Sequence, residues 1–190
     1  YKLIKHEKNV GTVKNLLSAV EAASGKYIRD FGPGDLFYNE KSLGRLYDFM
    51  EREQCEACFG LVRGYYNDNQ NKNRTVNFYH PFDLNAYKRQ DNKKIKRNLV
   101  LFRDYPPGSC TSYTRNVYLH YLRLLSERII YTEDIFQILA AFDGVFFKFM
   151  PEYIIWYETE EGVSNSAGIY SKRMIDDVEE FYKYLYEEYG

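Results

Sequence analysis

Three carboxylates in the C-terminal third of the chain have the spacing of a metal site. Asp143 opens one apolar segment, which continues through Val145–Phe149, and Glu158 and Glu160 end the apolar run that begins at Ile154. A turn at Pro151 would join the two segments as a hairpin, because both are rich in aromatic and β-branched residues. Opposed residues and residues two apart on a strand share a face, so the three carboxylates would lie together.

A metal ion would relieve the repulsion between these carboxylates. Like charges that face each other across two strands are destabilising unless another group neutralises them. A divalent cation with oxygen ligands is one solution, and proteins commonly hold Mg²⁺ by one or two carboxylates together with phosphate oxygens. In the simpler interpretation the acids are solvated, and Gly144 ends a helix, which removes Asp143 from the strand.

The same residues resemble the motifs of the PD-(D/E)XK nucleases. Phe142–Val145 is similar to the Asp motif of that family, and Ile154–Glu160 is similar to its second strand. The resemblance implies hydrolysis of DNA phosphodiester bonds by a metal-activated water, with Asp143 and Glu158 as the metal ligands. The catalytic set that it implies is Asp143, Glu158, Glu160 and Lys172.

Two of these residues depart from the family pattern. Glu160 stands where the family usually has a Lys, and Lys172 would supply the missing charge from the last helix. Glu127 would be the extra acid that some members carry. The composition, rich in Tyr and poor in Gln, also resembles proteins of archaeal viruses, in which small nucleases of this family occur.

A basic stretch in the middle of the chain could bind nucleic acid. It contains one acid, Asp91, and aromatic residues flank it. Cations that meet phosphates and rings that stack on bases are typical of a nucleic-acid surface. In the alternative interpretation the stretch is solvated and its charge is balanced by the acidic last helix. The cations concerned are Arg74, Lys88, Arg89, Lys93, Lys94, Lys96 and Arg97.

Two cysteines have the spacing of metal ligands or of a redox pair, Cys55 and Cys58. Zinc is disfavoured because a structural site needs two more ligands, for which His80, Cys110 and His120 are the candidates. A thioredoxin-type pair opens a helix after a strand, whereas this pair follows a helix. Buried thiols, or a disulfide with Cys110, fit the pattern better.

The elements that must position these groups follow from hydrophobic periodicity. Gly32-Pro33-Gly34 predicts a turn, and residues 86–97 predict a loop or a solvated helix. Apolar residues at helical spacing predict helices within residues 13–20, 43–50, 117–125, 135–142 and 175–185. Strands are predicted at 61–66 and 75–82, at 99–102, and at 145–149 and 153–159. We therefore expect an α+β fold with a mixed or antiparallel sheet, built from hairpins and packed against helices.

Length and composition fit one domain over residues 1–190, with a subdomain break near 106–108 as an alternative. The net charge of −1 creates no global basic field, and the 20 Tyr and 13 Phe suit an aromatic core better than a wet binding surface. No apolar run approaches a membrane span, no signal peptide is visible, and the odd number of cysteines argues against a secreted disulfide framework. We expect a cytoplasmic protein without a membrane partner, in a virus-infected host cell if the viral resemblance holds.

The carboxylates and the basic stretch support one another, because a nuclease must hold the DNA backbone. We predict a Mg²⁺-dependent DNA nuclease, and a homodimer if the substrate is a junction with two sites to cut. The alternative is a non-enzymatic protein of viral or plasmid type that binds nucleic acid or a host protein.

Overall fold

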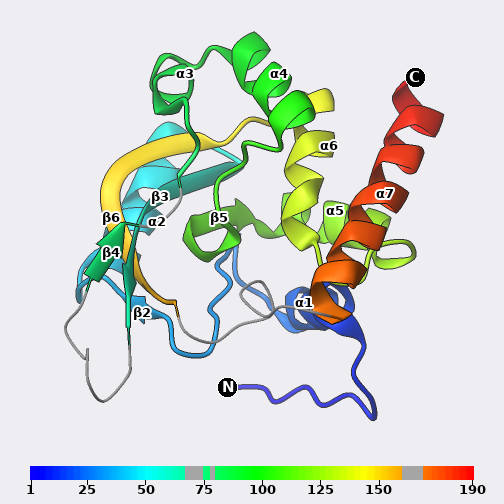
Figure 1. Ribbon diagram of the computed structural model, residues 1–190. Coiled ribbons are helices and arrows are strands. Elements are labelled where there is room, and N and C mark those ends of the chain that lie inside the picture. The colour runs from blue at the N-terminus through cyan, green and yellow to red at the C-terminus, as the bar shows by residue number, and fades with distance from the viewer. Residues whose placement is uncertain (67–74, 78–79, 160–168) are drawn as a thin grey trace.

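The computed structural model describes residues 1–66, 75–77, 80–159 and 169–190 (Figure 1). In these ranges a mixed β-sheet packs against helices, which confirms the predicted α+β class. The α-helices are α1 (Gly11–Ala22), α2 (Ser42–Glu53), α3 (Leu84–Arg89), α4 (Asn92–Phe102), α5 (Arg115–Ser126), α6 (Phe136–Phe142) and α7 (Ile169–Tyr189), with short 3-10 helices η1 (Gly108–Cys110) and η2 (Glu133–Ile135). The strands are β1 (Tyr27–Ile28), β2 (Leu36–Phe37), β3 (Ala57–Tyr65), β4 (Thr75–Asn77), β5 (Thr111–Thr114) and β6 (Lys148–Glu158).

The sheet has the order β1-β5-β3-β6-β2, and β4 also pairs with β3. The central strands β3 and β6 are parallel, and the other pairs are antiparallel. The first four residues of β3, Ala57–Gly60, are all buried, as expected of a strand covered on both faces. Helices α1, α5, α6 and α7 gather on one side of the sheet (Figure 1).

One predicted hairpin is confirmed and the other is wrong. Strands β3 and β4 pair antiparallel as expected of the hairpin predicted from residues 61–66 and 75–82, although β4 ends at Asn77 and residues 80–82 are not part of a strand. The segments on either side of Pro151 form one continuous strand, β6, which runs parallel to β3. Phe149 pairs with Phe59 and Tyr153 with Leu61, so the residues between them, including Pro151, bulge out of the ladder. A proline is tolerated at a bulge because its missing N–H leaves no ladder hydrogen bond unmade.

All five predicted helices are present, as α1, α2, α5, α6 and α7. The basic stretch forms α3 and α4, and its N-caps are Asp83 and Asp91, whose carboxylates accept the backbone N–H groups of Ala86 and Lys94. Residues 99–102, predicted as a strand, are the last turn of α4. None of the helices in the described ranges is both long and apolar enough to span a bilayer.

Aromatic rings join the sheet to the helices in the core. Tyr113 of β5 stacks on Tyr118 of α5, with ring centroids 4.3 Å apart. Phe136, at the start of α6, is fully buried and stacks on Tyr121 of α5 at 5.3 Å. This packing fixes the start of α6, and therefore the η2 turn before it, against the end of the sheet.

Candidate active site

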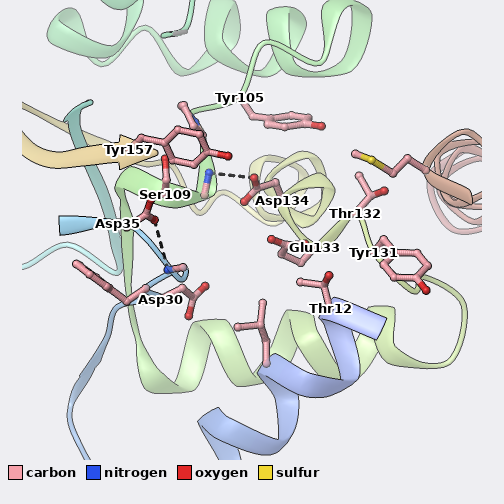
Figure 2. A pocket seen from close by; sticks show the side chains of 16 residues that line it. Thr12, Asp30, Asp35, Tyr105, Ser109, Tyr131, Thr132, Glu133, Asp134 and Tyr157 are labelled. Carbon is pink, nitrogen blue, oxygen red and sulfur yellow. Dashed lines mark hydrogen bonds between the residues drawn. The ribbon is translucent and has the colours of Figure 1, made fainter. Parts of the chain in front are cut away.

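A cavity of about 510 Å³ lies beside the η2 turn (Figure 2). Its walls come from the segment after β1, the segment that leads into η1, the turn before α6, the first turns of α1 and α7, and the end of β6. Its size is within the usual range of small-molecule sites. Four carboxylates line it: Asp30, Asp35, Glu133 and Asp134.

A tight turn places Asp35, whereas the carboxylate of Asp30, just before the turn, accepts a hydrogen bond from the hydroxyl of Tyr118. The N–H of Asp35 donates to the carbonyl oxygen of Gly32 at 3.2 Å, which confirms the turn predicted at Gly32-Pro33-Gly34. The carboxylate of Asp35 accepts the N–H of Gly32 at 3.3 Å, as Figure 2 shows. Gly34 has a φ of 86°, a conformation that strains a residue with a side chain, and a Cβ there would also displace the carboxylate of Glu158, so glycine is strongly favoured.

Arg29 ties this segment to the opposite wall of the cavity. Its guanidinium donates to the carbonyl oxygens of Gly108 at 3.3 Å and Thr111 at 2.5 Å, and to that of Ser109. No carboxylate pairs directly with Arg29 in the described residues. Its positive charge partly offsets the rise that burial causes in the pKa values of Asp30 and Asp35.

Asp134 is held by the wall that Arg29 fixes. The N–H of Gly108 donates to Oδ2 of Asp134 at 2.9 Å (Figure 2). The cavity also leaves Glu133 and Asp134 partly accessible, although protein surrounds both side chains. A proton can therefore reach Asp134 from a molecule bound in the cavity.

Burial raises the proton affinity of both of these neighbouring acids. Burial raises the pKa of Asp134 to about 7, against the hydrogen bond from Gly108. Burial and then the charge of Asp134 raise the pKa of Glu133 well above its usual range. Both acids therefore bind a proton more tightly than an ordinary carboxyl group, and Asp134 can exchange one near neutral pH, which is typical of an acid–base site.

The structure does not bring together the predicted metal ligands. Asp143 follows α6 and accepts hydrogen bonds from the hydroxyls of Tyr121 at 2.9 Å and Tyr189 at 3.0 Å. Glu158 lies at the other end of β6, beside Gly34, after roughly 30 Å of strand. The pairing that would have opposed the carboxylates is absent because β6 is one strand. Gly144, with a φ of 83°, ends the helix as the simpler interpretation expected.

The other predicted catalytic residues are also separate from the cavity or outside the described residues. Lys172 is exposed in the first turn of α7, and Glu127 is exposed just after α5, 4.0 Å from Lys14. Glu160 and Arg74 lie outside the described residues.

The described cations of the basic stretch lie on α3 and α4. Lys94 forms an ion pair with Asp83, and the ammonium of Lys96 lies 3.7 Å from the centre of the Phe142 ring. The remaining four are exposed, and their contact with nucleic acid stays a prediction: Lys88, Arg89, Lys93 and Arg97.

The three cysteines, Cys55, Cys58 and Cys110, are buried and free. In the part of the chain that the structure describes, no group of three or more His, Cys, Asp or Glu side chains could hold a metal ion. Because the three thiols are buried and unbonded, they match the interpretation as buried side chains rather than as a disulfide.

None of the four cavity acids was expected from the sequence. A signal exists at Glu133 and Asp134, which follow Thr132 and open a helical segment. Acids are common in the first turn of any helix because they interact favourably with its dipole, so this signal resembles ordinary capping. Asp30 and Asp35 flank the Gly-Pro-Gly turn, and only the fold shows that this turn faces Asp134.

Comparison with known proteins assigns the family. A search of curated proteins found no match. The model of Glycosyl transferase family 2 matches residues 1–122 of the 190, a range that includes Asp30 and Asp35 and ends before Glu133. This match contradicts the predicted PD-(D/E)XK nuclease, with its hydrolase and DNA-binding functions, and it gives no support to a non-enzymatic binding protein. The chain belongs to Glycosyl transferase family 2.

Proposed function

We propose that the cavity catalyses the transfer of a glycosyl group from an activated sugar to an acceptor hydroxyl, with Asp134 as the general base. The family supplies the reaction class. The observation that carries the proposal is the position of Asp134 in the cavity, where burial raises its pKa to about 7. A general base works best when its pKa is close to the operating pH.

The bond changes balance with one proton transfer. The acceptor oxygen forms a bond to the anomeric carbon of the sugar, and its proton passes to the Asp134 carboxylate. The bond between the anomeric carbon and the leaving group breaks, and the leaving group takes the electron pair. The N–H of Gly108 holds one carboxylate oxygen, at 2.9 Å, which orients the other carboxylate oxygen toward the proton.

Glu133 has a different role in the proposal. Burial raises its pKa and so favours the protonated form, which can donate a hydrogen bond to a hydroxyl or phosphate oxygen of a substrate. In the proposal, Glu133 holds the substrate as a hydrogen-bond donor, and the adjacent Asp134 activates the acceptor hydroxyl as the base.

Enzymes of this family commonly use a divalent cation, and the cavity offers part of the ligand set that such a cation would need. Asp30 and Asp35 offer oxygens, the ligand type that Mg²⁺ prefers, and burial raises the pKa of each, so a nearby cation would stabilise their charged forms. Since the described residues contain no group of three such ligands, further oxygens would have to come from water or the donor. A bound cation would supply charge neutralisation for the leaving group.

The substitution Asp134→Asn tests the proposal. It keeps the acceptor for Gly108 and removes the base, so kcat should fall by about 10²- to 10⁴-fold. The measurement is transfer or release of sugar from a panel of phosphate-activated sugars, with the folded state checked by circular dichroism.

Asp143→Asn is the matched control, because Asp143 is an acid that lies outside the cavity. We expect its kcat to equal that of the unmodified protein. The proposal is wrong if Asp134→Asn retains full activity, or if the unmodified protein transfers no sugar from any donor of the panel.

A further inference from the structure

Asp177 of α7 binds a turn that belongs to the active site. It is 5% exposed, and its carboxylate accepts three consecutive backbone N–H groups. These come from Ile130 at 3.0 Å, Tyr131 at 2.7 Å and Thr132 at 3.0 Å. The hydroxyl of Thr132 adds a fourth hydrogen bond at 3.3 Å. The next residue along the chain is Glu133.

The three N–H groups of the turn suit a negatively charged acceptor such as the Asp177 carboxylate. Successive N–H groups that point the same way form a concave site for an anion, and hydrogen bonds to a charged acceptor are about twice as strong as neutral ones. A buried carboxylate is unfavourable unless its oxygens are paired, and Asp177 meets that condition only while the turn keeps its shape. The side chain and the turn therefore hold each other in one conformation.

The first turn of α1 holds the same segment from the other side. The N–H of Val13 donates to the carbonyl oxygen of Ile130 at 3.0 Å. A second contact from α7 is the guanidinium of Arg173, which donates to the Tyr131 hydroxyl at 2.8 Å. Figure 2 shows Tyr131, Thr132, Glu133 and Asp134 in succession along the edge of the cavity. The position of the two acids thus depends on contacts from helices at opposite ends of the chain.

We propose that Asp177 is a positioning residue for glycosyl transfer, which sets the direction of Glu133 and Asp134 by binding the turn before them. It does not line the cavity, so it acts through the turn and not on the substrate. The inference rests on the proposed function for its effect on rate. Its effect on the Asp134 carboxyl group is independent of any substrate.

Several titratable groups surround Asp134 and Asp177. Asp134 interacts with Asp30 and Glu133, and with Tyr105, Cys110 and Tyr113 from the segments that pack against it. Asp177 interacts with Glu133, and the surface around it carries Glu127, Arg128, Asp176, Glu179, Glu180 and Lys183. A control must therefore remove a charge from this surface without touching the turn, and Asp176→Asn does so because Asp176 is adjacent and exposed.

The experiment compares Asp177→Asn with Asp176→Asn in the full chain. The Asn amide keeps one acceptor oxygen but replaces the other with an NH2 group, which faces at least one N–H of the turn donor to donor, so the turn should loosen and admit water to Asp134. We expect the titration midpoint of the Asp134 carboxyl carbon, followed by NMR without substrate, to fall from about 7 toward the ordinary value of 3.8. We expect kcat to fall by about 100-fold, because a small misplacement of a catalytic group has an effect of that size.

If Asp177 had a purely structural role, Asp177→Asn would lower the melting temperature but leave the Asp134 titration midpoint and kcat of the folded protein unchanged. Measurements well below the melting temperature separate these effects, and Asp177→Glu, which keeps the carboxylate, should recover part of the midpoint and of kcat. The proposal is overturned if Asp177→Asn and Asp176→Asn have the same midpoint and the same kcat. If Asp134→Asn alone leaves kcat intact, the general-base function fails, while a shifted midpoint in Asp177→Asn still supports the positioning of Asp134.

Discussion

Single carboxylates in this protein differ in chemistry because their surroundings differ. Asp143 accepts hydrogen bonds from two tyrosine hydroxyls, and Asp177 accepts four hydrogen bonds from one turn. Asp134 interacts with the backbone N–H of Gly108 and the side chain of Gln137, and it lines the cavity beside Glu133. Only this last environment combines burial with access for a substrate, and residue type in the sequence does not distinguish the three.

The raised pKa of Asp134 makes a prediction about stability. Its pKa is about 7 in the folded protein against an ordinary 3.8, so between these pH values the folded state binds more protons than the unfolded state. The free energy of unfolding should therefore fall as pH rises from about 4 to about 7, by on the order of 4 kcal/mol from this group. Asp134→Asn removes this loss, so it should be more stable than the unmodified protein at pH above 7.

Urea unfolding of both proteins near pH 4.5 and near pH 8 measures the difference. The gain from Asp134→Asn should be large at the higher pH and small at the lower one. An equal gain at both pH values would contradict a raised pKa for Asp134.

At the scale of elements, α1 and α7 keep the η2 turn in place. Gly11 opens α1 with a φ of 82°, and its Cα lies against Ile130, the first residue of the turn that Asp177 binds. These contacts join residues near the two ends of the chain. The hairpin prediction failed at the same scale, because Pro151 suits a bulge within β6 as well as it suits a turn.

Alanine substitutions at two glycines should have opposite effects on stability. A Cβ at Gly11 would lie 2.3 Å from Cγ2 and 2.6 Å from the carbonyl oxygen of Ile130, in a backbone conformation that disfavours alanine. We expect Gly11→Ala to lower the free energy of unfolding by about 1–3 kcal/mol. Gly44, on the exposed face of α2, is the control, because a Cβ added there would meet no other atom within 4 Å outside the helix's own backbone.

Gly44→Ala should raise the free energy of unfolding by about 0.5–1 kcal/mol, because alanine loses less backbone entropy in a helix. Urea unfolding measures both variants. A stabilising Gly11→Ala would show that the contact between α1 and Ile130 is loose.

In the whole molecule, aromatic side chains connect the sheet to the helices. Phe136 is fully buried and contacts the rings of Tyr113, Tyr118, Tyr121 and Phe147. The abundance of Tyr and Phe thus reflects the core in this region, as the composition favoured. Because Phe136 follows η2 directly, the same packing supports the cavity.

Removing a core ring should therefore be far more destabilising than removing a surface ring. We expect Phe136→Ala to lower the free energy of unfolding by about 3–5 kcal/mol, since it leaves a cavity among rings. Phe82, which is 67% exposed, is the control. Phe82→Ala should change the free energy of unfolding by less than about 0.5 kcal/mol. Similar losses in the two variants would contradict the central place of Phe136.

The sequence by itself determined the five main helices, the α+β class, the β3–β4 hairpin and the turn at Gly32–Gly34. These features depend on hydrophobic periodicity and turn residues, which act over a few neighbouring positions. Tertiary structure alone decided that β6 is one strand parallel to β3, and that Asp30, Asp35, Glu133 and Asp134 share a cavity. Strand pairing and burial arise between segments far apart in the chain, and the proton affinity of Asp134 depends on what those segments exclude from its surroundings.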